Sequence, residues 1–277
     1  MTITIQKLFD HVENIPKIPE VVRTLIKQVN DPNVDFSLIA ENVEKEQVIS
    51  VKILRLVNSA HYGVPKQVGS IQQAIVILGL TELKKLIITS GVISAISDVP
   101  GLNIDDFWLD NYRTASYAEF IAKQSNIKDS DLIFTAGLLN NLGTILIHLG
   151  ESDIAKQVQL DVRRGQDRVS VEQKHLGYTS QQVTAELCKQ WQFSDELIET
   201  IINSSEPLSS DEISLGSCAI SVARFISQST YSEKTEEEIL AEFPRKEWQQ
   251  LGLKETEIEE KMALMLELDT GIEGLLD

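Results

Sequence analysis

The chain has 277 residues, which is long enough to bury a sizeable core and by length alone favours two domains over one. Hydrophobic residues make up 42% of the chain and aromatic residues only 6%, a balance typical of Leu/Ile/Val/Ala-rich helices rather than of a β-sandwich. Its 42 acidic and 25 basic residues give a formal charge of −17. We therefore expect no nucleic-acid partner and no membrane partner, unless a local basic patch overrides the mean charge.

The cysteines and the N-terminal residues favour a cytoplasmic location. Both cysteines, Cys188 and Cys218, lie within apolar helical patterns, which favours buried free thiols over a disulfide and suits a reducing cytoplasm. The first ten residues lack the long apolar run of a signal peptide, and no stretch reaches the ~18 uninterrupted apolar residues that a membrane span needs. We expect a soluble, cytoplasmic protein.

Residues 1–97 show helical periodicity and turn signals without sustained alternation. Ile15-Pro16-Lys17-Ile18-Pro19 predicts an extended segment, because each proline biases its predecessor away from helix. A helix should begin at Glu20, with Val29 on its apolar side, and break at Asn30-Asp31-Pro32-Asn33. Further helices are predicted at about 36–44, 47–59, 70–78 and from the N-cap Thr81 to about residue 96. The segment 1–97 reads as an N-terminal helical subdomain.

Asp98-Val99-Pro100-Gly101 marks the predicted boundary to a second helical subdomain, residues 98–230. His148 lies one turn before a helix end, where a favourable contact with the helix dipole is the usual role. Thr179 and Gln182 predict a capping box, and Ser194 caps the next helix. The helices are predicted at about 105–124, 129–149, 152–164, 170–176, 179–191, 194–203 and 212–227.

The segment 231–277 differs in charge. Residues 208–277 contain 16 acidic and 6 basic residues. Ile258, Met262, Met265 and Leu266 still recur at helical spacing, so we predict a short acidic amphipathic helix docked on the core as a C-terminal extension.

Two adjacent amides, Asn140 and Asn141, interrupt an apolar segment. At helical spacing at least one of them must point toward a packed interior, where an unpaired amide costs about 1–3 kcal/mol. Two interpretations remain open: a satisfied polar contact between helices, or a former metal site.

The second interpretation rests on a resemblance. Phe134 to Gly143 resembles the A-G-L-L-H-D-I-G element of HD-superfamily phosphohydrolases, in the HDOD (HD-related output domain) branch of bacterial signalling proteins. Three further stretches are similar to HDOD motifs in order and spacing, and Glu46-Gln47 stands where the family usually has Asp-Pro; the stretches are 15–19, 52–62 and 70–79. The resemblance implies an all-α, HD-like helical bundle with an N-terminal helical subdomain and a short acidic C-terminal helical tail.

The resemblance also places the HD metal ligands, and every matched position has changed. Asp110, in Trp108-Leu109-Asp110-Asn111, stands at the first His, while Asn140 and Asn141 replace the His-Asp pair. The remaining ligand and accessory positions fall in 176–180, 203–207 and 222–225 and are occupied by Ser180, Ser204, Ser205 and Arg224. The resemblance thus implies no catalytic residue, no metal and no cofactor.

The expected loss of metal affinity is large enough to favour a site without metal. Four lost ligands, each weakening affinity only 10–100-fold, together weaken binding by roughly 10⁴- to 10⁸-fold, and without metal no hydroxide forms near neutral pH. The four histidines, His11, His61, His148 and His175, fall on none of the vacated positions. If Asp110 and Arg224 come together, the guanidinium could replace the charge of the metal and bond to Asp110 and to the carbonyls of Asn140 and Asn141, forming a polar lock.

Three functions remain. We expect a catalytically inactive HDOD signalling or scaffolding module that binds protein partners in bacterial signal transduction. The alternative is a sensor that binds a nucleotide or phosphorylated metabolite in the vestigial pocket through Arg224, Arg113 and amide donors. Residual metal-dependent phosphohydrolase activity comes third. GxGxxG, P-loop and G-x-S-x-G motifs are absent, and basic pairs such as Lys84-Lys85 are isolated.

One helix face is a candidate interaction surface. Lys52, Arg55 and Asn58, spaced i, i+3 and i+6, could present a polar stripe to a partner. Alternatively Lys52 is solvated, Arg55 pairs with a local carboxylate, and Asn58-Ser59 end the helix.

Overall fold

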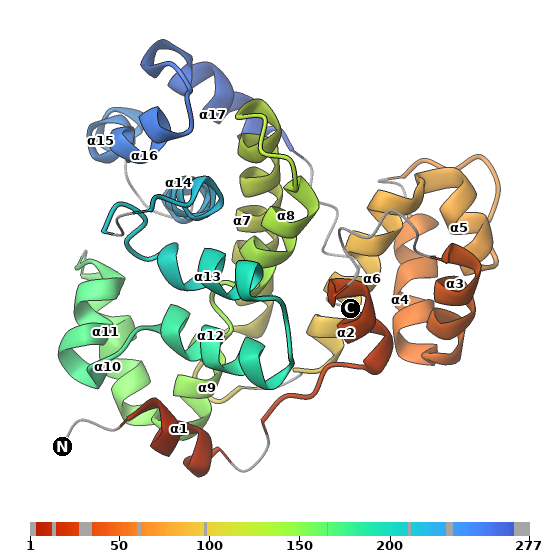
Figure 1. The fold of residues 1–277 in the computed structure, drawn as a ribbon, viewed down its shortest axis with the longest axis horizontal. Coiled ribbons are helices and arrows are strands. Elements are labelled where there is room, and N and C mark those ends of the chain that lie inside the picture. The colour runs from red at the N-terminus through yellow and green to blue at the C-terminus, as the bar shows by residue number, and fades with distance from the viewer. Residues whose placement is uncertain are drawn as a thin grey trace.

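A computed structural model describes residues 4–12, 15–27, 35–59, 62–96, 99–164, 166–209, 212–230 and 235–268. Over these residues the fold is all-α, as predicted, and contains no strand (Figure 1). The helices in chain order are α1 (Ile5–His11), α2 (Glu20–Lys27), α3 (Phe36–Lys45), α4 (Gln47–Val57), α5 (Ile71–Leu78), α6 (Leu80–Ser94), α7 (Ile104–Gln124), α8 (Ser130–Leu139), α9 (Gly143–Gly150), α10 (Ser152–Arg163), α11 (Arg168–Leu176), α12 (Ser180–Gln190), α13 (Asp195–Asn203), α14 (Leu215–Thr230), α15 (Glu236–Glu242), α16 (Arg245–Gln250), η1 (Glu255–Glu257) and α17 (Ile258–Leu266).

Helices α2 to α6 form one group, seen on the right of Figure 1. Helix α6 is buried from Leu83 to Ile93 and packs against α2, α4 and α5. It begins at Leu80 after Gly79, not at the predicted cap Thr81. Val29 and the predicted break at 30–33 lie outside the described residues. The apolar faces of α2 and α4 therefore pack on α6, the central helix of this group.

Helix α7 is the centre of the second group. It packs against α8 on one side and α14 on the other. A Cβ on Gly137 of α8 would lie 2.8 Å from the Cα of Ala115 in α7, so only glycine allows these helices their close approach. The predicted caps Thr179, with its capping box, and Ser194 begin α12 and α13 as expected.

The predicted continuous helix 129–149 is wrong, because the chain turns at residues 140–142 between α8 and α9. The Asn140 amide donates to the Gly137 carbonyl, which competes with the helical backbone bond. The Thr184 hydroxyl of α12 accepts from the Gly143 N–H at 2.8 Å and donates to the Asn140 carbonyl at 3.2 Å. Tertiary hydrogen bonds thus satisfy the groups that the helix break releases.

The first helix lies apart from the rest of the N-terminal segment. Helix α1 packs against α9, and the His11 ring lies 3.4 Å from Glu151, just after α9. Figure 1 shows α1 beside α9, away from α3 to α5. The division into 1–97, 98–230 and 231–277 stays a prediction.

The C-terminal segment is helical and docked on the core, but it holds α15, α16 and a short 3₁₀ turn before α17. Ile258, Met262 and Met265 are buried as expected, whereas Leu266 is 47% exposed. Phe225 of α14 contacts Phe243, which contacts Trp248, in successive edge-to-face ring pairs. An apolar contact therefore joins this acidic segment to the core.

One stretch, Ser130–Gly150, is long and apolar enough to cross a membrane by composition, with a mean hydropathy of 1.6. It comprises α8 and α9, and 94% of its most apolar window is buried inside the protein. This is the signature of a core helix pair, and the described chain offers no other such stretch. The cytoplasmic location stays an expectation.

Candidate functional site

Asp110 lies in the middle of α7, half-buried against α14. Its Oδ1 accepts a hydrogen bond of 2.6 Å from the Ser227 hydroxyl. Burial raises the pKa of the Asp110 carboxyl, while the Ser227 hydrogen bond and the guanidinium groups of Arg168, Arg224 and Arg113 act in the opposite direction. The carboxylate is thus held by a hydroxyl within a region of positive charge.

The two amides occupy the turn between α8 and α9, and both side chains are buried. Asn140 Nδ2 donates to the Gly137 carbonyl and, at 3.5 Å, to Asn111 Oδ1, which fixes the orientation of the amide. Its Oδ1 is buried without a hydrogen-bond partner. Asn141 Oδ1 instead accepts from Thr144 at 2.8 Å. The first amide ties α8 to α7, and the second is a local contact.

Ser180 begins α12 and is fully buried. Its N–H and its hydroxyl both donate to Glu172 Oε2, at 2.7 and 2.9 Å. Arg168 Nη1 approaches the other carboxylate oxygen at 3.4 Å and Arg168 Nη2 donates to Gln159. Glu172 thus places a carboxylate at the N-terminus of α12, where the helix dipole favours negative charge. The same carboxylate also contacts the guanidinium of Arg168.

Arg224 extends from α14 into the same region. Its Nη2 donates to the Ser204 carbonyl at 2.8 Å, and its Nη1 is buried without a hydrogen-bond partner. Burial lowers the pKa of Arg224, and the carboxylates of Glu172 and Asp110 act to raise it. The charges are close enough to interact, but the hydrogen bonds expected for the polar lock, to Asp110 and to the amide carbonyls, are not the ones formed. Ser227 instead bonds to Asp110 and Thr144 bonds to Asn141, while Asn140 Oδ1 has no partner.

Ser204 and Ser205 use their hydroxyls locally. Each donates to a carbonyl three residues earlier, Ile201 at 2.7 Å and Ile202 at 3.1 Å, and so ends α13. Their side chains are therefore not directed toward Asp110. The structure brings Asp110, Ser180 and Arg224 into one charged cluster with Glu172 and Arg168, and places the two serines at its edge.

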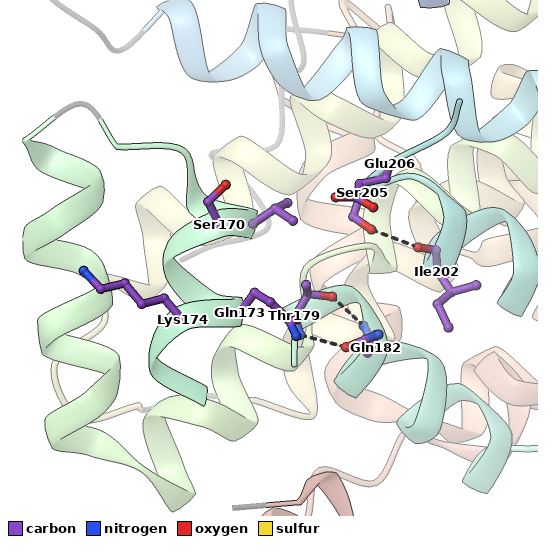
Figure 2. Close-up of a pocket in the computed structure, with 9 residues that line it drawn as sticks. Ser170, Gln173, Lys174, Thr179, Gln182, Ile202, Ser205 and Glu206 are labelled. Carbon is purple, nitrogen blue, oxygen red and sulfur yellow. Dashed lines mark hydrogen bonds between the residues drawn. The ribbon is translucent and has the colours of Figure 1, made fainter. Parts of the chain in front are cut away.

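A cleft of about 570 Å³ opens beside this cluster (Figure 2). Figure 2 shows it between α11, the start of α12 and the turn after α13, with Ser205 as the one predicted site residue on its wall. Several of its polar groups are already engaged, because Thr179 and Gln182 cap each other and Ser205 bonds to Ile202. The lining residues are Val169, Ser170, Gln173, Lys174, Thr179, Gln182, Ile202, Ser205 and Glu206.

The cluster is poor in metal donors. Within the part of the chain that the structure describes, no group of three or more His, Cys, Asp or Glu side chains is placed to hold a metal ion. Apart from the Asp110 carboxylate, amide, hydroxyl and guanidinium groups fill the matched positions, and a guanidinium repels a cation. These residues do not fit the metal of the HD enzymes.

The predicted stripe on α4 is only partly available. Asn58 ends α4, donates to the carbonyls of Leu54 and Val68, and accepts from the Val68 N–H at 2.8 Å. Asn58 thus ends the helix, as the alternative interpretation of the stripe expected, and it also holds the following loop through Val68. Arg55 is exposed and Lys52 is half-buried.

Sequence reasoning missed three residues of the cluster. Glu172 and Arg168 lie in a helix whose pattern resembles any solvated helix, and Ser227 lies near the end of α14 with no motif around it. The one available signal was Glu172 next to Val171 on the apolar side of a short helix, since a carboxylate there needs a partner.

Comparisons with known proteins agree with the architecture. The family model of the HDOD domain matches residues 15–207. The crystal structure of a protein from Shewanella amazonensis SB2B, named “Putative phosphohydrolase”, is 27% identical, with a TM-score of 0.77 over 97% of this chain and 96% of that one. That of a “Putative signal transduction protein” from Marinobacter aquaeolei VT8 is 20% identical, with a TM-score of 0.76 over 95% of this chain and 59% of that one.

An uncharacterized protein of Treponema pallidum is 25% identical over 197 residues, or 69% of this chain. The chain spans only 38% of that curated relative. The family match covers well over half of the chain and includes the turn with the two amides, α7 and the start of α12. The chain belongs to the HDOD domain family.

Proposed function

We propose that this chain is a non-catalytic HDOD module that acts in bacterial signal transduction by binding protein partners. The observation that carries the proposal is that charged groups which bond to other parts of the chain occupy the region matched to the HD metal site. Glu172 is engaged by Ser180 and Arg168, Asp110 by Ser227, and Arg224 by the Ser204 carbonyl.

The chemistry of the donor set supports this proposal. Hydrolysis by an HD enzyme needs a metal to generate hydroxide near neutral pH, and that metal needs imidazole and carboxylate ligands. A fixed guanidinium at the matched Arg224 position supplies positive charge without a coordination site. The fold kept its framework of helices while this site took on a structural role.

The test has two parts. The purified chain should hold no stoichiometric metal by elemental analysis, and with Mg²⁺, Mn²⁺, Zn²⁺ or Fe²⁺ added it should hydrolyse neither phosphomonoesters nor phosphodiesters above background. Asn141→Ala serves as the matched variant, since its amide lies at the position of the HD aspartate. Metal-dependent hydrolysis that this substitution abolishes would overturn the proposal.

Partner binding needs its own measurement. A protein captured from the source cells by the immobilised chain should bind again when both components are purified, with a Kd measured by calorimetry. Failure of every captured candidate to bind in purified form argues against a protein-binding role.

A second function is favoured by one observation: the buried Nη1 of Arg224 has no acceptor, and Arg224 is one of three arginines, with Arg113 and Arg168, whose charge acts on Asp110. A phosphate oxygen of a nucleotide or phosphorylated metabolite is the acceptor that such a donor prefers. A nucleotide panel should then raise the melting temperature of the chain, and Arg224→Lys should reduce the shift. No shift across the panel leaves partner binding as the better account.

A further inference from the structure

Helix α6 connects the first group of helices (α2 to α6) to the second group, which is centred on α7. It packs against α2, α4 and α5 of its own group and against α8 of the second, and Figure 1 shows it on the side of its group that faces α7 and α8. In the described part of the chain, α6 with α8 is the one closely packed helix pair that joins the two groups. Helix α6 ends at Ser94 and α7 begins at Ile104, so neither helix continues into the other group. The contacts of α6 therefore decide whether the groups stay together.

The face of α6 toward its own group is apolar and closely packed. Leu83, Ile87 and Gly91 lie at i, i+4 and i+8, and both side chains are at most 1% exposed. A Cβ on Gly91 would collide with Val22 of α2 and lie 3.3 Å from Ile49 Cδ1 of α4. Moving α6 within its own group would therefore break dense apolar packing.

The face of α6 toward the second group begins with polar residues. Lys85 donates to Glu119 of α7, and Glu82 and Thr89 lie three residues before and four residues after Lys85, on the same helix face. Glu82 lies 3.7 Å from Lys85 Nζ. Thr89 is 0% exposed and its hydroxyl has no hydrogen-bond partner. The apolar Ile93 continues this face, but its first half buries an ion pair and an unpaired hydroxyl.

The polar residues lower the free energy that is needed to separate the two groups. Separation returns Lys85 and Glu119 to water, which recovers the hydration that both charges lost on burial. Separation also lets water bond to the Thr89 hydroxyl. Moving α6 away from α2 and α4 would instead expose Leu83 and Ile87 to water without such compensation. The contact between the groups is thus easier to break than the packing of α6 inside its own group.

We propose that the first group separates from the second as a unit, with α6 leaving α8 while both groups stay folded. Separation uncovers the polar face of α6 and the Phe134 ring of α8, which is 1% exposed in the closed form and lies 5.2 Å from Lys85 Nζ. The closed form thus hides a surface, and opening controls the access of a partner to it. This inference concerns the packing of the two groups and does not rest on the proposed function.

Thiol labelling of the full chain under native conditions tests the proposal. Thr89→Cys places a thiol between the groups, and it should preserve the fold because the two side chains are similar in size and the Thr89 hydroxyl makes no hydrogen bond. Val57→Cys, at a fully buried position of α4 in the first group, is the matched control. The natural, buried Cys188 of α12 reports on the second group. Circular dichroism checks that each variant is folded.

Thr89→Cys should be labelled at least about tenfold faster than Cys188, because separation requires less free energy than unfolding. Its labelling rate should rise with urea less steeply than that of Cys188, because separation exposes less surface than unfolding does. Val57→Cys should react as slowly as Cys188.

Three outcomes overturn the proposal. Rates that differ less than this among all three positions would mean that the chain opens only by unfolding. Fast labelling of Val57→Cys together with Thr89→Cys would mean that the first group unfolds instead of separating. A Thr89→Cys rate that does not depend on urea would mean a local fluctuation of α6. None of these outcomes bears on metal-dependent hydrolysis or on partner capture, which are measured separately.

Discussion

Glu172 is only 1% exposed and accepts three hydrogen bonds, more than Asp110, the other carboxylate of the charged cluster. Glu172→Ala should lower the free energy of unfolding by about 3 kcal/mol, because it leaves the Ser180 N–H and hydroxyl unpaired and removes the counter-charge of Arg168. Urea denaturation at neutral pH measures the effect. Glu259→Ala, at an exposed position of α17, should change stability by no more than about 0.5 kcal/mol. Equal losses for the two variants would mean that the cluster stabilises nothing.

We expect His148 to make the stability of the chain depend on pH. The ring is 3% exposed, lies 3.3 Å from the Pro100 carbonyl, and has its pKa lowered by burial. The expected contact of a charged His148 with the helix dipole is therefore replaced by a neutral, buried ring. A lowered native pKa means that stability is complete above the ordinary pKa of 6.5 and is lost as the pH falls from there through the native value.

His148→Gln should remove this part of the pH dependence. Chemical denaturation at about pH 7.5 and about pH 5 should show a smaller loss of stability for the variant than for the wild type. His11→Gln is the control, because the His11 side chain is 54% exposed. If the wild type and His148→Gln lose the same free energy on acidification, His148 is not the group responsible.

At the site, the sequence indicated which positions match the HD motifs but not what the side chains at those positions would contact. Asp110, Asn140 and Arg224 follow from matched motifs, since local spacing carries that information. Their partners Ser227, Asn111 and the Ser204 carbonyl are set by how α7, α8, α13 and α14 cross. Asp110 and Ser227 lie 117 residues apart in the sequence, so no local sequence pattern predicts their hydrogen bond.

At the scale of helices, a buried ion pair joins the group of α2 to α6 to the second group, which is centred on α7. Lys85 of α6 donates to both carboxylate oxygens of Glu119 in α7, at 2.7 and 2.6 Å, and lies 5.2 Å from the Phe134 ring of α8. Lys123 also contacts Glu119, at 2.6 Å. Of the basic pair Lys84-Lys85, which is isolated in the sequence, Lys85 therefore forms a contact between α6 and the core of the second group.

Lys85→Met should destabilise the chain by about 2–4 kcal/mol, because it removes the buried partner of Glu119 and leaves only the more exposed Lys123. Equilibrium unfolding followed by circular dichroism measures this loss. Lys45→Met removes an exposed pair with Glu41 and should cost less than about 1 kcal/mol. A Lys85 variant as stable as the Lys45 variant would show that the buried pair does not hold α6 against α7.

Helix ends were predictable where a side chain in the sequence makes the cap. Thr179 and Ser194 cap the helices they were expected to cap, because Ser and Thr satisfy the first backbone N–H groups. The turn at 140–142 was not predictable, because Thr184 of another helix supplies the bonds that allow it. A Cβ on Gly143 would collide with the Ser180 carbonyl, so the same turn also depends on the close approach of α12.

At the scale of the whole molecule, the acidic C-terminal segment is part of one structure with the core. Trp248 is 1% exposed, its Nε1 donates to the Lys254 carbonyl at 3.0 Å, and its ring contacts Phe243, which contacts Phe225 of α14. Lys261 reaches Gln124 at the end of α7, at 2.7 Å. The apolar periodicity of this segment predicted docking, and the ring contacts explain why ten acidic residues do not repel it from an acidic core.

Trp248→Ala tests whether the segment unfolds together with the core. Removing a fully buried tryptophan should cost about 3–5 kcal/mol. In this variant the remaining tryptophans, Trp108 and Trp191, both belong to the second helical group, so their fluorescence follows the unfolding of the core alone. A lower denaturation midpoint by fluorescence means that loss of the C-terminal contact weakens the core. Leu160→Ala, on an exposed face of α10, should leave the midpoint unchanged. A wild-type midpoint for Trp248→Ala would make the segment an independent appendage, because cooperative unfolding transmits a lost contact only within one structural unit.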